Sequence, residues 1–283
     1  MPGTNTYNTM RNLIIIMSLL LLVSCKDAAL PSESGMEEQA KELLAQANSA
    51  YEAQDYTKAK ILLDSIKRTY PRAFKVGCER EVLYNRVLVD EKKRDVEFLE
   101  SEIERLSQLR DSLAKSFDYR KDSRYEDFAV YSHPSQAISK NAGNCFMRAT
   151  VNEDAEAVIT SFYRGNRIGY NRIKVSSGGV FVEVDVKNAD RPWTGREYGV
   201  YVERYGFKLG NDGDIMKFIA NAQGPIVVEL SGNTSKYTYE LRKEDANAIR
   251  QVLGLQRVLA AIKENREALD HARYALAYLG QGK

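Results

Sequence analysis

The spacing of apolar positions divides the chain into a helical first part, a β middle and a helical end. From Glu37, apolar residues recur at intervals of three and four, the period of an amphipathic helix. In the middle of the chain the period falls to two, as in strands with one buried face. From Lys243 the helical period returns. We therefore expect an α+β fold with a helical region over 37–120, an antiparallel β domain over 124–242 and a C-terminal helix or helix pair over 243–283 that packs back on the rest.

Residues 54–71, QDYTKAKILLDSIKRTYP, place large and small residues at the spacing of a repeat helix, with Tyr56, Ala59, Leu63, Ile66 and Pro71 at the key positions. Ala47 is the small residue at which a preceding helix approaches closely. The pattern resembles one tetratricopeptide (TPR) repeat of about 34 residues, with Gln54 where that family often has glycine and without its early tryptophan. The resemblance implies an antiparallel helical hairpin and, weakly, protein or peptide binding. A hairpin used only as scaffold is the alternative.

The charged stretch 82–117 carries a heptad-like seam that Arg110 interrupts, formed by Val96, Leu99, Ile103, Leu106, Leu113 and Phe117. Three heptads are compatible with a short coiled coil. We favour packing of this seam inside the chain, on the hairpin or on the C-terminal helix. Pairing with a second copy, which would give a homodimer, stays open.

Eight segments of the middle region are typical of strands: 128–131, 145–151, 157–163, 170–175, 180–186, 198–205, 226–230 and 237–241. In VFVEVDV, the alternation places Val180, Val182, Val184 and Val186 on one buried face. A short helix over 215–222 interrupts the strands. The pattern predicts a sandwich or a partly open barrel. Residues 218–232 and 236–253 faintly resemble segments of bacterial proteins, and this resemblance implies no activity.

Near the start of the chain, the apolar run Leu13–Val23 is too short to span a bilayer but has the length of a signal-peptide core. The next residues complete the sequence Leu22-Val23-Ser24-Cys25, which resembles the lipobox of bacterial lipoproteins, including those of Bacteroidetes. The resemblance implies a signal peptide over 1–24, lipid on Cys25, a tether over 25–36 and attachment to the outer membrane, on a face that stays open. A short anchor helix with a chance cysteine is the alternative.

Charge and cysteine usage restrict the partners. Without the single arginine of the signal segment, 40 basic and 39 acidic side chains remain, so a nucleic-acid partner is not expected. The expected partners are the membrane, through the lipid anchor, and another envelope protein or a second copy. With only two histidines, a histidine-based zinc site is improbable, and we expect no cofactor.

Cys78 and Cys145 are expected as free, partly buried thiols, although export would also permit a disulfide.

No group of residues matches a catalytic constellation. Asn211, Asp212 and Asp214 could be calcium ligands but lack the acidic twelfth position of an EF-hand, so a helix cap is the better interpretation. Three further candidates have simpler structural explanations: His133 in a surface turn, Cys145 without a recognisable base, and the pair Glu183 and Asp185 on a solvent-facing strand.

The β region also contains a candidate ligand platform of aromatic residues, formed by Tyr170, Trp193, Tyr198, Tyr201 and Tyr205. Such rings can bind a sugar or a peptide, but core and cross-strand packing also explains them. The sequence therefore favours a non-enzymatic scaffold or protein-binding module anchored in the envelope. A carbohydrate- or peptide-binding lipoprotein is the second hypothesis, and a hydrolase with an unrecognised site is the third.

Overall fold

The computed structural model describes residues 33–121, 127–197 and 199–281, so Cys25 and Tyr198 lie outside the described residues. These residues form helices and two antiparallel sheets, which confirms the α+β prediction. The chain divides into two compact units. The helical unit holds the described residues up to Lys93 and those from Leu276, and the sheet unit holds Arg94–Ala275. Two long helices, α4 (Phe74–Ala114) and α6 (Lys243–Gln281), contribute to both units.

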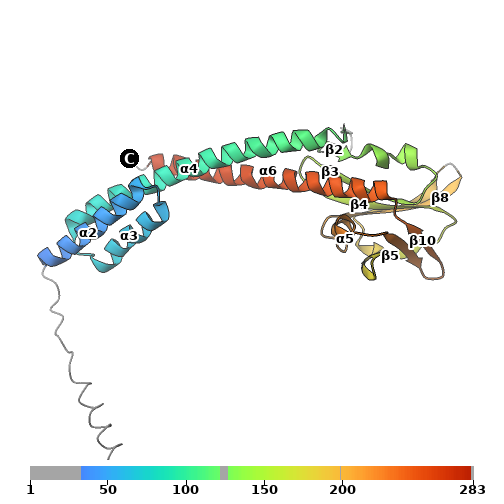
Figure 1. The fold of residues 1–283 in the computed structure, drawn as a ribbon, viewed down its shortest axis with the longest axis horizontal. Helices are drawn as coiled ribbons and strands as arrows, with labels where there is room; N and C mark the ends of the chain where they lie inside the picture. The colour runs from blue at the N-terminus through green and yellow to red at the C-terminus, as the bar shows by residue number, and fades with distance from the viewer. Residues whose placement is uncertain (1–32, 122–126, 198, 282–283) are drawn as a thin grey trace, which may run out of the picture. The chain divides into compact units, whose positions relative to one another are not determined.

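The helical unit is built from α2 (Glu33–Glu52), α3 (Tyr56–Thr69) and the first part of α4 (Figure 1). Ala47 of α2 and Ala59 of α3 are fully buried, and the larger Leu63 and Ile66 fill the core beside them. Small residues of this kind let two helices approach closely. The hairpin that the apolar spacing predicts is therefore present.

Local polar contacts explain where α3 begins and how α4 joins the hairpin. The Asp55 side chain caps α3 by accepting a hydrogen bond from the Lys58 backbone N–H at 3.0 Å. Gln54 has a left-handed φ of 59°, which explains why glycine suits this position. On the other side, Lys60 of α3 forms an ion pair with Glu91 of α4, with 2.7 Å between the charged atoms.

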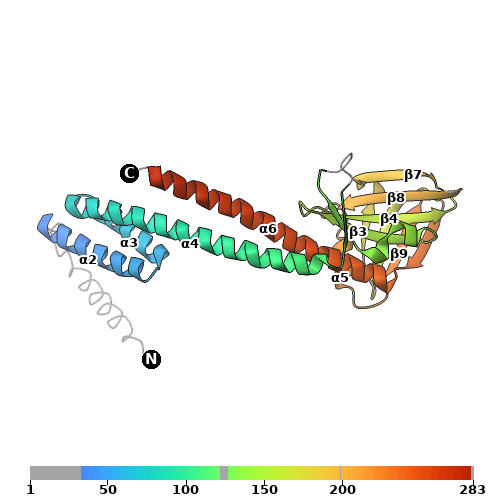
Figure 2. The same cartoon turned by 90° about the horizontal axis from the view of Figure 1, so that it is seen from above.

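Two antiparallel sheets form most of the sheet unit (Figure 2). The six-stranded sheet has the order β1 (Asp118–Arg120), β2 (Val130–Ser132), β3 (Phe146–Asn152), β4 (Ala157–Gly165), β8 (Val200–Lys208) and β7 (Arg191–Glu197). The four-stranded sheet has the order β10 (Lys236–Glu240), β9 (Val227–Gly232), β5 (Tyr170–Ser177) and β6 (Val180–Asp185). The sequence pattern did not predict β1 and β7, which form the two edges of the larger sheet. Three short 3₁₀ turns span Pro134–Gln136, Ile138–Asn141 and Val186–Asn188.

One hydrophobic core joins both sheets to the helices of this unit. It includes Ile159 and Phe207 from the larger sheet, Ile173 and Leu230 from the smaller, Ile215 of α5 (Ile215–Asn221) and Ile249 of α6. Because this core lies against one face of the larger sheet, the opposite face of β3, β4, β8 and β7 is directed away from it. We call that opposite face the outer face.

Within the sheet unit, α4 and α6 run antiparallel and side by side (Figures 1 and 2), and Arg273 of α6 forms an ion pair with Glu100 of α4 at 2.7 Å. Leu106 is buried, and Leu113 and Phe117 pack against the core. The seam therefore packs within the chain over this part, and α6 packs back as a single helix. None of the helices in the described part of the chain is long and apolar enough to cross a lipid bilayer.

Two details of the sequence prediction are wrong. The alternating valines of β6 do not share a continuous buried face, since Val184 is buried but Val180 is 64% exposed. As the edge strand of the smaller sheet, β6 extends beyond the core at its Val180 end. The second correction concerns the thiols: Cys78 and Cys145 are both free, as expected, but Cys78 is exposed rather than partly buried.

Candidate anion-binding face of the six-stranded sheet

The outer face carries a row of paired residues that crosses four strands. Arg148 of β3 lies opposite Thr160 of β4, Thr160 lies opposite Gly206 of β8, and Gly206 lies opposite Arg191 of β7. Directly opposed residues of antiparallel strands project to the same side of the sheet. The register therefore brings two arginines to the ends of one row, with a threonine and a glycine between them.

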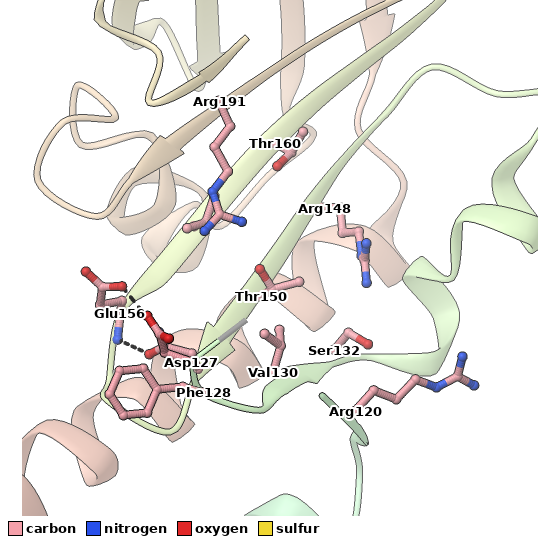
Figure 3. Close-up of a pocket in the computed structure, with 12 residues that line it drawn as sticks. Arg120, Asp127, Phe128, Val130, Ser132, Arg148, Thr150, Glu156, Thr160 and Arg191 are labelled. Atoms are coloured by element: carbon pink, nitrogen blue, oxygen red, sulfur yellow. Dashed lines mark hydrogen bonds between the residues drawn. The ribbon is translucent and has the colours of Figure 1, made fainter. Parts of the chain in front are cut away.

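This row lies in an open concavity of about 560 Å³, which we call the arginine pocket (Figure 3). Its lining combines cationic, hydroxyl and acidic side chains with a few apolar ones: Arg120, Asp127, Phe128, Val130, Ser132, Arg148, Thr150, Asn152, Glu156, Val158, Thr160 and Arg191. In Figure 3, the guanidinium groups of Arg148 and Arg191 lie on either side of the threonines, and Glu156 and Asp127 lie on the Arg191 side. The pocket therefore combines three arginines with two acidic residues.

Arg148 is the least solvated of the three arginines. Its Nε is buried and has no hydrogen-bond partner, and its guanidinium forms no ion pair with any described residue. Burial lowers the pKa of this guanidinium, yet an arginine side chain stays charged in proteins. Partial burial of a cation without a counter-charge is unfavourable, and no described residue supplies that counter-charge to Arg148.

The acid nearest to the pocket floor is already engaged. Glu156 forms an ion pair with Lys208 at 2.8 Å and accepts a hydrogen bond from the Asn152 side chain at 3.2 Å. The hydrogen bond from Lys208 is the largest cause that lowers the pKa of Glu156, so this carboxylate is ionised and its charge is compensated. Arg120 and Arg191 make no ion pair with the described residues, so the arginines of the pocket are not neutralised by Glu156.

Gly206 leaves room between the arginines. A Cβ atom at this position would lie 3.2 Å from Thr160 Oγ1 and 3.4 Å from Arg191 Cβ, which is tighter than most Cβ contacts. Without it, the Thr160 hydroxyl and the stem of Arg191 border a notch in the sheet surface. Glycine within a strand often marks such a close approach.

The chain matches no protein-family model, no curated protein and no solved structure. The geometry of the sheet unit is therefore the basis for assigning a function.

The described residues of the predicted aromatic platform do not form one exposed surface. Tyr170 is 1% exposed, and its hydroxyl donates a hydrogen bond to Ser161 at 3.2 Å. The Tyr205 ring is half-buried and packs edge-on against Tyr170 at 4.8 Å, so the core explains both tyrosines. Tyr201 lies on the same face of β8 as Tyr205, and the Arg167 guanidinium carbon lies 5.6 Å from the centre of the Tyr201 ring.

Trp193 lies on the opposite side of the sheet, on the outer face, and is 38% exposed. The Arg204 guanidinium lies 4.0 Å from the centre of the Trp193 ring, a cation–π contact. Phe146 and Phe162 stack in the same row at 4.6 Å. Of the described platform residues, only Trp193 therefore neighbours the arginine pocket.

The inner face of the same sheet holds a buried carboxylate that the sequence pattern did not reveal. Glu203 is fully buried and accepts hydrogen bonds from the backbone N–H groups of Ile168 at 2.8 Å, Gly169 at 3.0 Å and Tyr170 at 3.2 Å. These contacts hold the connection between β4 and β5.

The sequence does contain a signal for the position of Arg148 on the outer face. In FMRATVN, Arg148, Thr150 and Asn152 alternate with buried apolar residues.

Of the candidate calcium residues, Asp212 serves the start of α5. It accepts hydrogen bonds from the Met216 N–H at 2.8 Å and from the Gly210 N–H at 3.2 Å. Asp214 is the N-cap residue directly before α5 but makes no side-chain capping hydrogen bond, and the Asn211 side chain donates to Asp190 at 3.4 Å. No group of three histidine, cysteine, aspartate or glutamate side chains among the described residues could hold a metal ion.

The other chemical candidates also have structural roles. The His133 ring accepts a hydrogen bond from the Ser135 N–H at 3.3 Å in a turn, and burial lowers its pKa. Asp185 caps a 3₁₀ turn by accepting from the Lys187 N–H at 3.0 Å. The Cys145 sulfur lies 3.4 Å from the Arg164 backbone nitrogen. These contacts bring no nucleophile and base together.

Proposed function

We propose that the protein is a lipid-anchored, non-enzymatic binding module of the cell envelope, which presents the arginine pocket to an acidic partner protein. The observation that carries this proposal is Arg148, a partly buried cation whose buried Nε has no hydrogen-bond partner and which has no anion among the described residues. Such a group lowers stability unless something compensates it. A partner that brings a carboxylate to the pocket supplies the missing charge.

The local nature of the positive charge also supports a specific partner. The mature chain has nearly equal numbers of basic and acidic side chains, so it does not attract anions by net charge. The pocket instead gathers three arginines, Arg120, Arg148 and Arg191, in one open concavity of the sheet unit. Complementary charge at one patch favours selective encounter with an acidic surface.

Crosslinking in cells tests the proposed partner. A photo-crosslinking residue at Thr150 in the pocket is compared with one at Lys217, which is exposed on α5. We expect an adduct only from position 150, with an acidic segment of another envelope protein or of a second copy, and its loss when Arg148 and Arg191 are both replaced by methionine. An adduct that persists in the double variant would contradict the proposed role of the pocket.

The anchor requires its own experiment, because Cys25 lies outside the described residues. We expect intact-mass analysis of the membrane fraction to find acyl chains on Cys25, and Cys25→Ala to leave the precursor uncleaved. Protease treatment of whole cells then shows which membrane face carries the protein. An unmodified wild-type chain would overturn the anchor but would leave the pocket argument intact.

Trp193 favours a second candidate function, the binding of an acidic carbohydrate. Its partly exposed ring adjoins the arginine pocket, and sugars stack on such rings. Because the chain has one tryptophan, its fluorescence reports on this surface directly. The ligands are polygalacturonate and, as a control, a neutral glucan, and the Trp193→Phe variant gives the background fluorescence. A spectral shift with polygalacturonate but not with the neutral glucan would favour the carbohydrate over the protein partner.

A further inference from the structure

The spacing of Arg148 and Arg191 suits a small ligand between them. Their strands are three positions apart in the sheet, which separates the two backbones by about 14 Å at the usual strand spacing. Both arginine side chains and the Thr160 side chain between them line the same pocket, on the row that Gly206 completes. A small anion in the pocket can therefore lie between the two arginines.

The chemistry of the gap is that of an oxyanion site. Guanidinium groups present planar pairs of N–H donors that match the oxygens of carboxylate and phosphate. The Thr150 and Thr160 hydroxyls line the same pocket and supply further donors. Glu156, which lies on the Arg191 side of the pocket (Figure 3), forms its ion pair with Lys208 rather than with either arginine.

From this arrangement we infer that Arg148 and Arg191 hold a single oxyanion, a carboxylate or a phosphate group, above the Thr160–Gly206 floor. This inference rests on the proposed function and specifies the group that the partner inserts. Arg148, the less exposed of the two, is fixed by the sheet and sets the position of the anion. Arg191 lies on the edge strand β7 and binds the same anion from its solvent-facing side.

The test uses the full-length protein, purified in a non-ionic detergent, and follows thermal unfolding by Trp193 fluorescence. The probes are inorganic phosphate and N-acetylglutamate, each compared with chloride at equal ionic strength. We expect a rise in the unfolding midpoint of about 4 °C at twenty times the dissociation constant. A rise with both probes indicates a general oxyanion site, and a rise with one identifies the group that the site prefers.

Matched variants separate this site from the general stabilisation that phosphate gives to proteins. We expect the double variant R148Q/R191Q to lose the anion-specific rise and R257Q/R266Q, which removes two exposed arginines of α6, to keep it. Thr160→Val should weaken binding about threefold, since it removes one hydroxyl donor but keeps the shape. Equal rises in all variants would overturn the site.

Failure of this inference is distinguishable from failure of the proposed function. If neither probe shifts the midpoint but the crosslink at position 150 forms and depends on the two arginines, the partner binds without a single inserted oxyanion. If the probes act through Arg148 and no crosslink forms, the anion site exists and the protein partner is wrong. Absence of both effects removes the pocket from consideration.

Discussion

Glu203 and Arg148 stand on opposite faces of one sheet and show two treatments of a poorly solvated charge. On the inner face, three backbone N–H groups surround the carboxylate of Glu203. On the outer face, Arg148 has a buried Nε without a partner and no ion pair among the described residues. The first charge is satisfied within the fold, and the second has no partner among the described residues.

The two residues therefore differ in their partners within the fold as well as in their exposure. A carboxylate that accepts several backbone hydrogen bonds fixes the local chain, as Glu203 does for residues 168–170. A cation without compensation contributes nothing comparable to folding and is retained at a cost. Substitution should therefore move stability in opposite directions at the two positions.

The largest expected effect is that of Glu203→Ala. The change leaves the three N–H groups of Ile168, Gly169 and Tyr170 without their acceptor, at a cost of about 3–5 kcal/mol in the free energy of unfolding. Urea unfolding followed by Trp193 fluorescence measures it in the sheet unit. Glu183→Ala, on the exposed edge strand β6, is the control and should cost far less. A loss below about 1 kcal/mol at Glu203 would remove the structural half of the comparison.

The opposite sign is expected for Arg148→Met. Methionine retains most of the apolar stem and removes the uncompensated charge, so the free energy of unfolding should stay unchanged or rise by about 1 kcal/mol. The same urea experiment gives the value, with Arg257→Met on α6 as the control for the loss of one arginine. A clear loss of stability at Arg148 alone would show that the fold depends on this arginine, and the argument for an external anion would weaken.

A smaller effect is expected from Tyr170→Phe, which tests the surroundings of Glu203. The buried hydroxyl donates to Ser161 at 3.2 Å, and its removal should cost about 1 kcal/mol. Tyr170 should otherwise keep its packing, because the ring contacts with Tyr163 and Tyr205 do not involve the hydroxyl. Tyr274→Phe on α6, where the ring is exposed, provides the unaffected reference in the same denaturation series.

Periodicity predicted the elements whose burial follows from local pattern. Ala47, Ala59 and Leu63 lie in the helical core as expected, because one helix face must face its neighbour. The edge strands β1 and β7 escaped prediction, since their residues are mostly exposed and β7 contains Pro192 and Gly195, which are unusual in strands.

The candidate site depends on register, which the sequence does not show. Arg148 and Arg191 lie 43 positions apart in the chain. The two strands between them, β4 and β8, bring them into one row of the sheet, and β8 comes after both residues in the sequence. The aromatic platform failed to form one surface for a related reason. Tyr170 and Trp193 belong to different sheets, and only the fold decides which rings turn inward.

A third buried charge, Asp245, gives the smallest effect and an unusual pH dependence. Its carboxylate forms an ion pair with Arg242 at 2.7 Å, but burial dominates and raises the pKa above the ordinary value of 3.8. The folded state therefore holds a proton that the unfolded chain releases between those two pKa values, so this contribution is full below pH 3.8 and is lost as pH rises through the folded pKa. Asp245→Asn removes that dependence. Urea unfolding from pH 3.5 to 7 should therefore show a difference in the free energy of unfolding between variant and wild type that changes by less than about 1 kcal/mol over this range. Asp270→Asn, exposed on the same helix, should run parallel to wild type. If Asp245→Asn also ran parallel, the Arg242 pair would fully compensate the charge, as the backbone does for Glu203, and Arg148 alone would remain uncompensated.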